Sequence, residues 1–350
     1  MGEEKAFFLS EEGREHLLRW YRREGRCLPW REGRDPYQIW VIETLLQQTQ
    51  ISQARTYIER FFQRFPTLEK LAQADVESLL EIWQGLGYYQ RAHNLHKAAQ
   101  QLYRDGGWEA IWRYPSPLRY LEALPGVGPY TARAILSFSE REAYLPVDGN
   151  VMRVLSRLWG LPTRSRTVYQ THADALPLHW RQREVGYALM DLAQLICVPR
   201  SPKCLLCPLK KECIALSQGR PSAYPPVPPP RQKPIRPFLF ILCTSREGVW
   251  LQKRPTRGLW GGLWCPPMQF LKECPSALPT FTHQLTHFQL WGYVEKKDIP
   301  PEETFLVPWE HLERTPLPAP LRRLLVEEAE TYKAPSSLQT SQVESYRPAL

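Results

Sequence analysis

The tract RPSAYPPVPPPRQKPIRP, residues 220–237, constrains the fold most, because eight prolines exclude a packed helix or a central strand. Each proline fixes its own φ and lacks the N–H that a helix or sheet would use. We therefore expect a semi-rigid linker at 220–237, and with it a domain boundary. A chain of 350 residues is also longer than a single core usually organises.

Residues 10–214, before the linker, show the apolar spacing of helices. In DPYQIWVIETLLQQTQISQARTYIERFF, Asp35 and Pro36 predict an N-cap and a first helical turn. Further helices are expected at 68–82, 91–103, 118–123, 129–139, 150–158 and 182–196, between Gly, Pro and Asp or Asn breaks. We interpret residues 1–219 as an all-α domain.

The sequence after the linker has a different texture. FLFILCTS (238–245), GVWLQKR (248–254) and LWGYVEKK (290–297) predict strands bounded by turns, and residues 320–331 predict a terminal helix. We expect a small α/β domain over 238–332. The last residues, 333–350, contain few apolar side chains and predict a flexible tail.

Composition adds a hint about partners. The chain is 43% hydrophobic and 23% charged, with a net charge of +9. A basic excess favours an acidic partner, nucleic acid first and an anionic membrane second, although a soluble enzyme with a basic surface fits equally well. No apolar run approaches the roughly 18 residues of a membrane span, and the start MGEEKAFFLSEEGREH is too acidic for a targeting signal. We expect the protein to stay where it is made.

Four of the eight cysteines are crowded into CVPRSPKCLLCPLKKEC, as Cys197, Cys204, Cys207 and Cys213. Six, two and five residues separate them. Such crowding suits a metal centre in a reducing compartment better than disulfides, and four thiolates can converge on one centre. Four sulfurs also suit zinc, but common zinc ribbons pair two closely spaced knuckles, whereas this segment has one.

The stretch LEALPGVGPYTARAIL, residues 121–136, predicts two helices joined by a tight turn at Gly126 and Gly128. Glycines permit left-handed backbone there and leave N–H groups uncovered, so with the next helix N-terminus they form a neutral phosphate cradle. LPVDGNVMRVL follows, and in it Asp148 stands just before a helical pattern. The ordinary interpretation of such an aspartate is an N-cap.

These segments resemble the endonuclease III superfamily of DNA glycosylases, in the helix-hairpin-helix, the V-D-G-N-V sequence and the cysteine spacing. LPWREGRDPYQIWVIETLLQQTQ (28–50) and GLGYYQRAHNLHKAAQ (85–100) narrow the resemblance to the MutY-type adenine DNA glycosylases. It covers nearly all of residues 26–215 in unbroken order. The resemblance implies that the four cysteines hold a 4Fe–4S cluster.

The resemblance also implies catalytic roles. Glu43 would protonate adenine at N7, which requires a pKa raised toward neutrality by a hydrophobic enclosure. Ile39, Trp40, Ile42, Leu46 and Gln47 flank Glu43 and are the expected walls. Asp148 would face the sugar and stabilise its positive charge, with Asn150 and Tyr130 orienting it or the water. Lyase members carry a lysine where this chain has Tyr130, so the resemblance implies a monofunctional glycosylase that leaves the DNA backbone intact.

Two further residues would help extrude the base from the duplex. By resemblance, Gln48 of the glutamine pair and Tyr88 of the GYY turn fill the vacated space, while Gly126 and Gly128 hold the DNA backbone. The alternatives are a helix-surface amide for Gln48 and a core tyrosine for Tyr88.

RPTRGLWGGLWCPPMQF (254–270) resembles the C-terminal Nudix-like domain of the same family. CPPMQFLKECPSAL lacks the glutamate-rich helix of a working Nudix hydrolase, so we expect no pyrophosphohydrolase activity. The family reads 8-oxoguanine with a loop usually written Phe-Ser-His, and LTHFQL here offers Thr286 and His287. The alternative is a buried His–Phe packing pair.

The sequence therefore predicts a multidomain protein: an all-α helix-hairpin-helix glycosylase domain with an iron–sulfur loop, plus a small α/β Nudix-like domain. We expect a monomeric glycosylase that removes adenine opposite 8-oxoguanine or guanine in double-stranded DNA, in the cytoplasm near a bacterial nucleoid. A thymine-mismatch glycosylase and a non-catalytic DNA-binding iron–sulfur protein are the alternatives.

Overall fold

The computed structural model describes residues 10–49, 51–227, 232–256 and 258–333. The chain divides into two compact units, each treated separately below. One joins the chain up to Ala74 to Asn94–Pro230, and the other joins Asp75–His93 to the chain from Arg231 onward. No helix in the described ranges has the length and apolar character that a membrane crossing requires.

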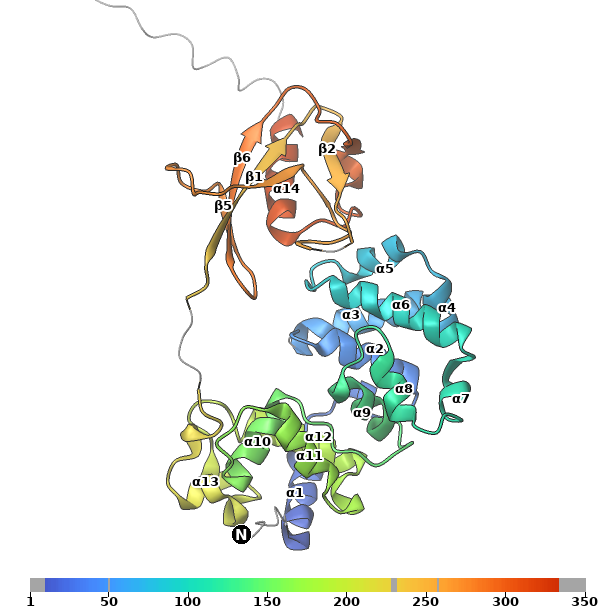
Figure 1. Cartoon of the computed structure of the whole chain (residues 1–350), viewed down its shortest axis with the longest axis vertical. Coiled ribbons are helices and arrows are strands. Elements are labelled where there is room, and N and C mark those ends of the chain that lie inside the picture. Colours follow the sequence, from blue (N-terminus) through green and yellow to red (C-terminus); the bar gives the residue numbers. More distant parts are fainter. Residues whose placement is uncertain (1–9, 50, 228–231, 257, 334–350) are drawn as a thin grey trace, which may run out of the picture. The chain divides into compact units, whose positions relative to one another are not determined.

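The first unit is helical, as predicted, and its helices run from blue to yellow in Figure 1. They are α1 (Glu11–Glu24), α2 (Pro36–Leu46), α3 (Ile51–Arg64), α4 (Leu68–Gln73), α7 (Gly107–Ile111), α8 (Pro117–Ala123), α9 (Pro129–Phe138), α10 (Gly149–Trp159), α11 (Arg166–Asp174), α12 (Arg183–Leu195) and α13 (Ile214–Ser217). Helix α5 (Val76–Trp83) belongs to the other unit, and α6 (Gln90–Arg104) crosses the division.

Capping residues explain where several helices begin. The Asp35 side chain accepts the backbone N–H of Tyr37 at 2.9 Å, and Pro36 occupies the first turn, which confirms the predicted start of α2. The single helix predicted over 68–82 is wrong, because the chain leaves the helix at Ala74. Asp75 then starts α5 by accepting the N–H of Ser78 at 2.7 Å.

Helix packing in this unit sets up the walls of one pocket. Helix α2 packs against α9, and α10 packs against α12, which also contacts α1. The second of these pairs is held by a core that includes Leu155, Tyr169, Trp180 and Leu189, all almost fully buried. Each pair brings together elements that lie far apart in the sequence.

The ends of the predicted linker are structured. The buried Tyr224 accepts a hydrogen bond at its carbonyl from Arg157 Nε (3.0 Å), so residues near it belong to the helical unit. At the other end, β1 already begins at Ile235 and includes Pro237, contrary to the prediction that this tract excludes a central strand. Pro237 is accommodated beside Trp291 of the parallel neighbour β6. Residues 228–231 lie outside the described ranges.

The C-terminal residues of the second unit form a small α/β structure, as predicted (Figure 1). Its elements are β1 (Ile235–Leu242), β2 (Gly248–Lys253), β3 (Trp264–Cys265), β4 (Met268–Phe270), β5 (Phe281–Gln284), β6 (Gln289–Lys296), β7 (Phe305–Pro308) and α14 (Ala319–Lys333). The strand orders are β4-β1-β6-β5 and β3-β2-β7. Strands β1 and β6 are parallel, and the other neighbours are antiparallel.

Helix α14 connects two small cores in this structure. Leu321 packs with Phe238 and Phe240 of the first sheet, while Leu325 packs with Leu251 of the second. Because one helix serves both sheets, its removal would expose both cores. Residues 334–350 of the predicted tail lie outside the described ranges.

Candidate active site

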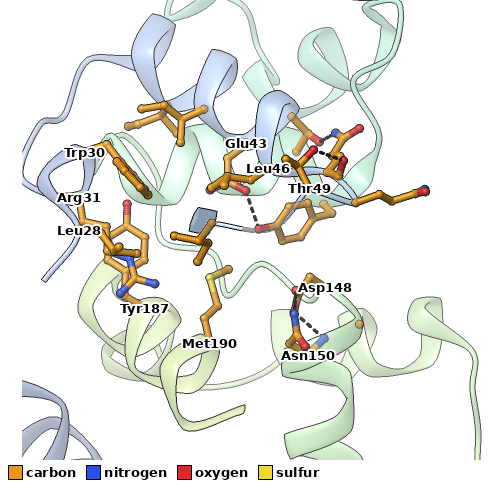
Figure 2. Close-up of a pocket in the computed structure, with 18 of the residues that line it drawn as sticks. Leu28, Trp30, Arg31, Glu43, Leu46, Thr49, Asp148, Asn150, Tyr187 and Met190 are labelled. Atoms are coloured by element: carbon orange, nitrogen blue, oxygen red, sulfur yellow. Dashed lines mark hydrogen bonds between the residues drawn. The ribbon is translucent and has the colours of Figure 1, made fainter. Parts of the chain in front are cut away.

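The helical unit contains a pocket of about 590 Å³ (Figure 2). Its walls come from α2 and the turn after it, the α8–α9 hairpin, the start of α10, and α12. Seven of the predicted site residues line it: Glu43, Gln48, Gly126, Gly128, Tyr130, Asp148 and Asn150. The fold thus gathers residues separated by more than a hundred positions in the sequence.

Glu43 projects from α2 into this pocket, where Ile39, Ile42 and Leu46 form part of the lining. Burial raises the pKa of Glu43 to about 7; the hydrogen bond from Tyr130 opposes this shift, and the charge of Asp148 adds to it. The carboxyl is therefore poised to give up or take a proton near neutral pH. Trp40, which we expected to be another wall, instead lies in the core, 1% exposed.

Tyr130, in the first turn of α9, donates its hydroxyl to Glu43 Oε2 at 2.7 Å (Figure 2). Burial, followed by the neighbouring charges of Glu43 and Asp148, raises the pKa of Tyr130 well above its ordinary value. The phenol consequently stays protonated at neutral pH. It serves as a hydrogen-bond donor and offers no amine for attack on a sugar.

Asp148 is the N-cap of α10, as the ordinary interpretation predicted, and it also lines the pocket. One carboxylate oxygen accepts the backbone N–H groups of Asn150 (2.9 Å) and Val151 (2.7 Å). The other accepts Asn150 Nδ2 at 2.8 Å. Three donors stabilise the negative charge at a fixed position beside the pocket.

Asn150 is held in turn by an arginine. Arg153 Nη2 donates to Asn150 Oδ1 at 3.2 Å, which leaves the Asn150 amide nitrogen directed at Asp148. Arg153 also donates to the carbonyl of Cys197 at 2.9 Å. The side chain that orients Asp148 is thus fixed from the cysteine segment.

The four cysteines line a second, separate pocket in the helical unit, together with apolar side chains such as Val154, Leu158 and Ile196. Arg157 Nη1 donates to Cys197 Sγ at 3.2 Å. Within the described ranges, no three His, Cys, Asp or Glu side chains are gathered closely enough for a single metal ion. The four cysteines therefore line one cavity, but their sulfur atoms are not grouped around a single point.

Comparison with known proteins identifies the family. The model of the HhH-GPD superfamily of base excision DNA repair proteins matches residues 41–176, and a NUDIX domain model matches residues 238–327. An adenine DNA glycosylase of Buchnera aphidicola is 32% identical over 296 residues, which cover 78% of this chain and 83% of the relative. The chain belongs to the adenine DNA glycosylase family.

A second curated relative agrees with this assignment, and two solved structures share the fold of the helical part. An adenine DNA glycosylase of Mycobacterium tuberculosis is 38% identical over 224 residues, covering 62% of this chain and 71% of the relative. Among solved structures, a thermostable thymine-DNA glycosylase has a TM-score of 0.52 at 28% identity, covering 58% of this chain and 94% of its own. A non-covalent endonuclease III–DNA complex has a TM-score of 0.50 at 21% identity, covering 61% and 99%, and shares the fold.

The α8–α9 hairpin of this adenine DNA glycosylase was predicted to have left-handed backbone at both glycines, and the structure shows it at one of them. Gly126 has the expected left-handed backbone (φ 75°), and a Cβ there would lie 2.7 Å from Asn94 Cβ. Gly128 has φ −87°, so its backbone is not left-handed. A Cβ at Gly128 would meet no atom within 4 Å, and the N-terminus of α9 is therefore open for a ligand.

Gln48 and Tyr88, the two predicted wedge residues, both have left-handed backbones, with φ 58° and 50°. Non-glycine residues seldom adopt this conformation, and it is often found at functional sites. Gln48 lines the pocket and is exposed, whereas Tyr88 lies outside the lining. Tyr88 is 48% exposed, which argues against a core tyrosine, and Arg91 lies 5.7 Å from its ring.

Thr286 and His287 occupy the turn between β5 and β6, and both are exposed. The turn is closed by the N–H of Leu285, which donates to the carbonyl of Phe288 at 3.0 Å. Phe288 packs toward Phe238, with ring centroids 6.4 Å apart. The alternative of a buried His–Phe pair is therefore wrong for His287, and Phe288 anchors the turn that presents its two polar neighbours.

Sequence reasoning missed a buried ion-pair cluster beneath the pocket. Asp191 of α12 is fully buried and accepts hydrogen bonds from Arg26 (2.7 Å) and Arg31 (2.9 Å). Arg31 lines the pocket and lies 4.6 Å from the ring centre of Tyr187 (Figure 2). Arg31 stands in the LPWR motif, which was a usable signal, whereas nothing near Asp191 in the sequence indicates its partners.

Proposed function

We propose that this enzyme hydrolyses the N-glycosidic bond of adenine mispaired with 8-oxoguanine or guanine in double-stranded DNA, leaving the backbone intact. The main observation behind this proposal is that Glu43, whose pKa is raised to about 7, lines the same pocket as Asp148, the N-cap of α10. Adenine is a poor leaving group as an anion, so a nearby acid is needed. At neutral pH about half of the Glu43 population would carry the required proton.

Glu43 would deliver that proton to N7 of the extruded adenine. Tyr130 hydrogen-bonds one oxygen of Glu43 and so orients the carboxyl. The apolar side chains beside Glu43 limit water, which keeps the protonated form available. The acid and its orienting donor come from two packed helices, α2 and α9.

Asp148 would oppose the acid from across the pocket. As the bond breaks, positive charge develops on the sugar, and an ionised carboxylate stabilises it electrostatically or traps it covalently. The three donors to Asp148 fix this charge before the substrate arrives, so little reorganisation is required. Water then completes hydrolysis, because Tyr130 has no amine to form a Schiff base.

Thymine is the competing substrate, since a thymine-DNA glycosylase shares the fold of the helical unit at 28% identity. Two observations favour adenine. The curated adenine DNA glycosylases match across most of the chain, and a NUDIX domain model matches residues 238–327. We assign the exposed Thr286 and His287 of that domain to recognition of 8-oxoguanine, with the Thr286 hydroxyl as a hydrogen-bonding group.

Extrusion of adenine needs groups that occupy the space it leaves. We assign Gln48 and Tyr88 to this role on their exposed, left-handed positions, and Gly126 and Gly128 to the DNA backbone. Chromosomal DNA as substrate would place a monomeric enzyme at the nucleoid.

The cysteine pocket fits a 4Fe–4S cluster better than zinc. Its four thiols share one cavity with apolar walls, and in the described ranges they do not converge as a single ion requires. Cys197, Cys204, Cys207 and Cys213 would hold the cluster, which would supply a structural cross-link between α12 and the following loop. Iron and sulfide analysis tests this assignment, and a preparation that holds stoichiometric zinc and no iron contradicts it.

Single-turnover assays on four duplexes test the proposed reaction. Each duplex carries adenine or thymine opposite guanine or 8-oxoguanine, and strand breaks are scored before and after alkali. We expect adenine release with breaks only after alkali, and faster release opposite 8-oxoguanine. Thymine release, or breaks without alkali, would overturn the proposal, and equal rates opposite both purines would remove the role of Thr286 and His287.

A further inference from the structure

The backbone just before Asp148 is held by one side chain of another helix. Gln170 of α11 accepts the N–H of Val147 with its amide oxygen at 3.1 Å. Its amide nitrogen donates to the carbonyl of Leu145 at 3.0 Å. Leu145 and Val147 are buried, so water cannot easily replace these bonds. Gln170 thus fixes the path by which the chain enters the Asp148 cap.

Gln170 is itself held by a charged neighbour. Its amide nitrogen also donates to Asp174 Oδ1 at 2.8 Å, one helical turn along α11. The other carboxylate oxygen of Asp174 accepts a hydrogen bond from Arg133 Nη2 at 2.9 Å. The orientation of the Gln170 amide is thereby defined, since its nitrogen must face Asp174 and its oxygen must face Val147.

Arg133 belongs to the hairpin. It lies on α9, three residues after Tyr130, and its Nη1 donates to Glu122 of α8 at 2.8 Å. The Arg133 side chain is 12% exposed, and those of Glu122 and Asp174 are 31% and 29% exposed, so the ion pairs are partly shielded from water. A continuous set of hydrogen bonds therefore joins both helices of the hairpin to the residue before Asp148.

We propose that Gln170 is a positioning residue, which with Asp174 and Arg133 sets the place of Asp148 relative to the DNA-holding hairpin. This inference rests on the proposed function, because it assumes that Asp148 acts on the sugar and that the hairpin holds DNA. An error of about 1 Å in such a group can cost about a hundredfold in rate. The peptide bonds on either side of Pro146 are where that error would arise, because they carry the contacts to Gln170.

Substitutions of Gln170 separate positioning from folding. In Gln170→Leu both backbone contacts are lost, and we expect the single-turnover rate to fall about tenfold to a hundredfold. The Kd for a duplex whose target adenosine carries a cleavage-resistant 2′-fluorine should change by less than about threefold, because the hairpin itself is intact. Hydrogen exchange of the Val147 amide should accelerate. Thr171→Ala is the matched control, because Thr171 is an exposed residue of the same helix whose hydroxyl donates to the carbonyl of Thr167.

A second pair of variants tests the hydrogen bond between Gln170 and Asp174 even if Gln170→Leu fails to fold. Gln170→Glu places a carboxylate against Asp174 and should lower the rate; adding Asp174→Asn restores a donor and should recover part of the loss. Full activity of folded Gln170→Leu, a rate loss matched by a loss of affinity, or no recovery in the double variant would overturn the inference. Asp148→Asn, measured in parallel, separates the two hypotheses: if it keeps full activity, the proposed function fails instead.

Discussion

The two carboxylates of the pocket show how local structure assigns different chemistry to similar groups. Glu43 lies in the body of α2 among apolar side chains, and its carboxyl accepts a hydrogen bond from Tyr130. Asp148 stands at the N-terminus of α10, where it accepts the backbone N–H groups of Asn150 and Val151 and the side-chain amide of Asn150. Burial favours the neutral form of Glu43, whereas the N–H groups at the N-terminus of α10 hold the Asp148 carboxylate in place. One pocket therefore offers both a proton and a fixed negative charge.

The largest effect should come from removing the acid. Glu43→Gln keeps the size of the side chain but cannot donate a proton as an acid, so we expect the single-turnover rate to fall by about 10⁴-fold. Glu59→Gln, an exposed glutamate on α3, is the control and should retain full activity. If Glu43→Gln retained more than about a tenth of the wild-type rate, Glu43 would not be the acid that protonates adenine.

Removing the fixed charge should have the next largest effect. Asn is as good an N-cap as Asp, so Asp148→Asn should leave the melting temperature nearly unchanged while the rate falls by about 10³-fold. Rate and melting temperature are measured on the same preparation. A large loss of stability with little loss of rate would mean that Asp148 serves as a cap alone.

The contrast also predicts a pH-dependent cost in stability. The pKa of Glu43 is raised from 4.5 to about 7 by folding, so between these values the folded state binds more protons than the unfolded state, and stability falls as pH rises. Glu43→Gln removes this penalty. We expect its free energy of unfolding to gain about 2 kcal/mol on the wild type between pH 5 and pH 8, after allowance for partial solvent access.

Urea unfolding at both pH values measures that gain. The other titrating groups are common to both proteins, so they cancel in the difference. A difference that stays constant from pH 5 to pH 8 would mean that the Glu43 environment does not disfavour the charged carboxyl.

Removing the hydrogen bond from Tyr130 to the acid should have the smallest effect. Tyr130→Phe should slow the reaction about fivefold to tenfold, since an orienting bond of this kind contributes about 1 kcal/mol. The bond lowers the pKa of Glu43, so its loss should move the alkaline fall in rate to higher pH. Tyr103→Phe is the matched control, because Tyr103 also donates to a glutamate, Glu69, but at an exposed site. A shift to lower pH would contradict the assigned contact.

Local signals in the sequence predicted much of this structure. Asp35 and Pro36 fixed the start of α2, and the glycine-rich turn fixed the hairpin, because caps and turns depend on neighbouring residues. The same holds for Asp148, whose capping contacts are only two and three residues away. Resemblance then supplied the roles that these local patterns could not.

Long-range contacts account for what the sequence did not predict. The backbone N–H of Arg26 reaches Asp191 across 165 residues, and Gln170 reaches Leu145 across 25, so neither pairing follows any periodic pattern. The strand at Pro237 was likewise decided by pairing with distant strands against local propensity. The break at Ala74, in contrast, has a local cause that the prediction overlooked, the N-cap of Asp75. The prediction of a left-handed backbone at Gly128 was wrong. This glycine instead leaves open space beside the N-terminus of α9, which the sequence alone does not reveal.

The pH dependence of the single-turnover rate on an adenine·8-oxoguanine duplex tests the central claim most directly. If Glu43 acts as the acid with a pKa of about 7, the rate should fall toward tenfold per pH unit above that value, and the residual rate of Glu43→Gln should lack this fall. A wild-type rate that stays level or rises between pH 7 and pH 9 would contradict the account.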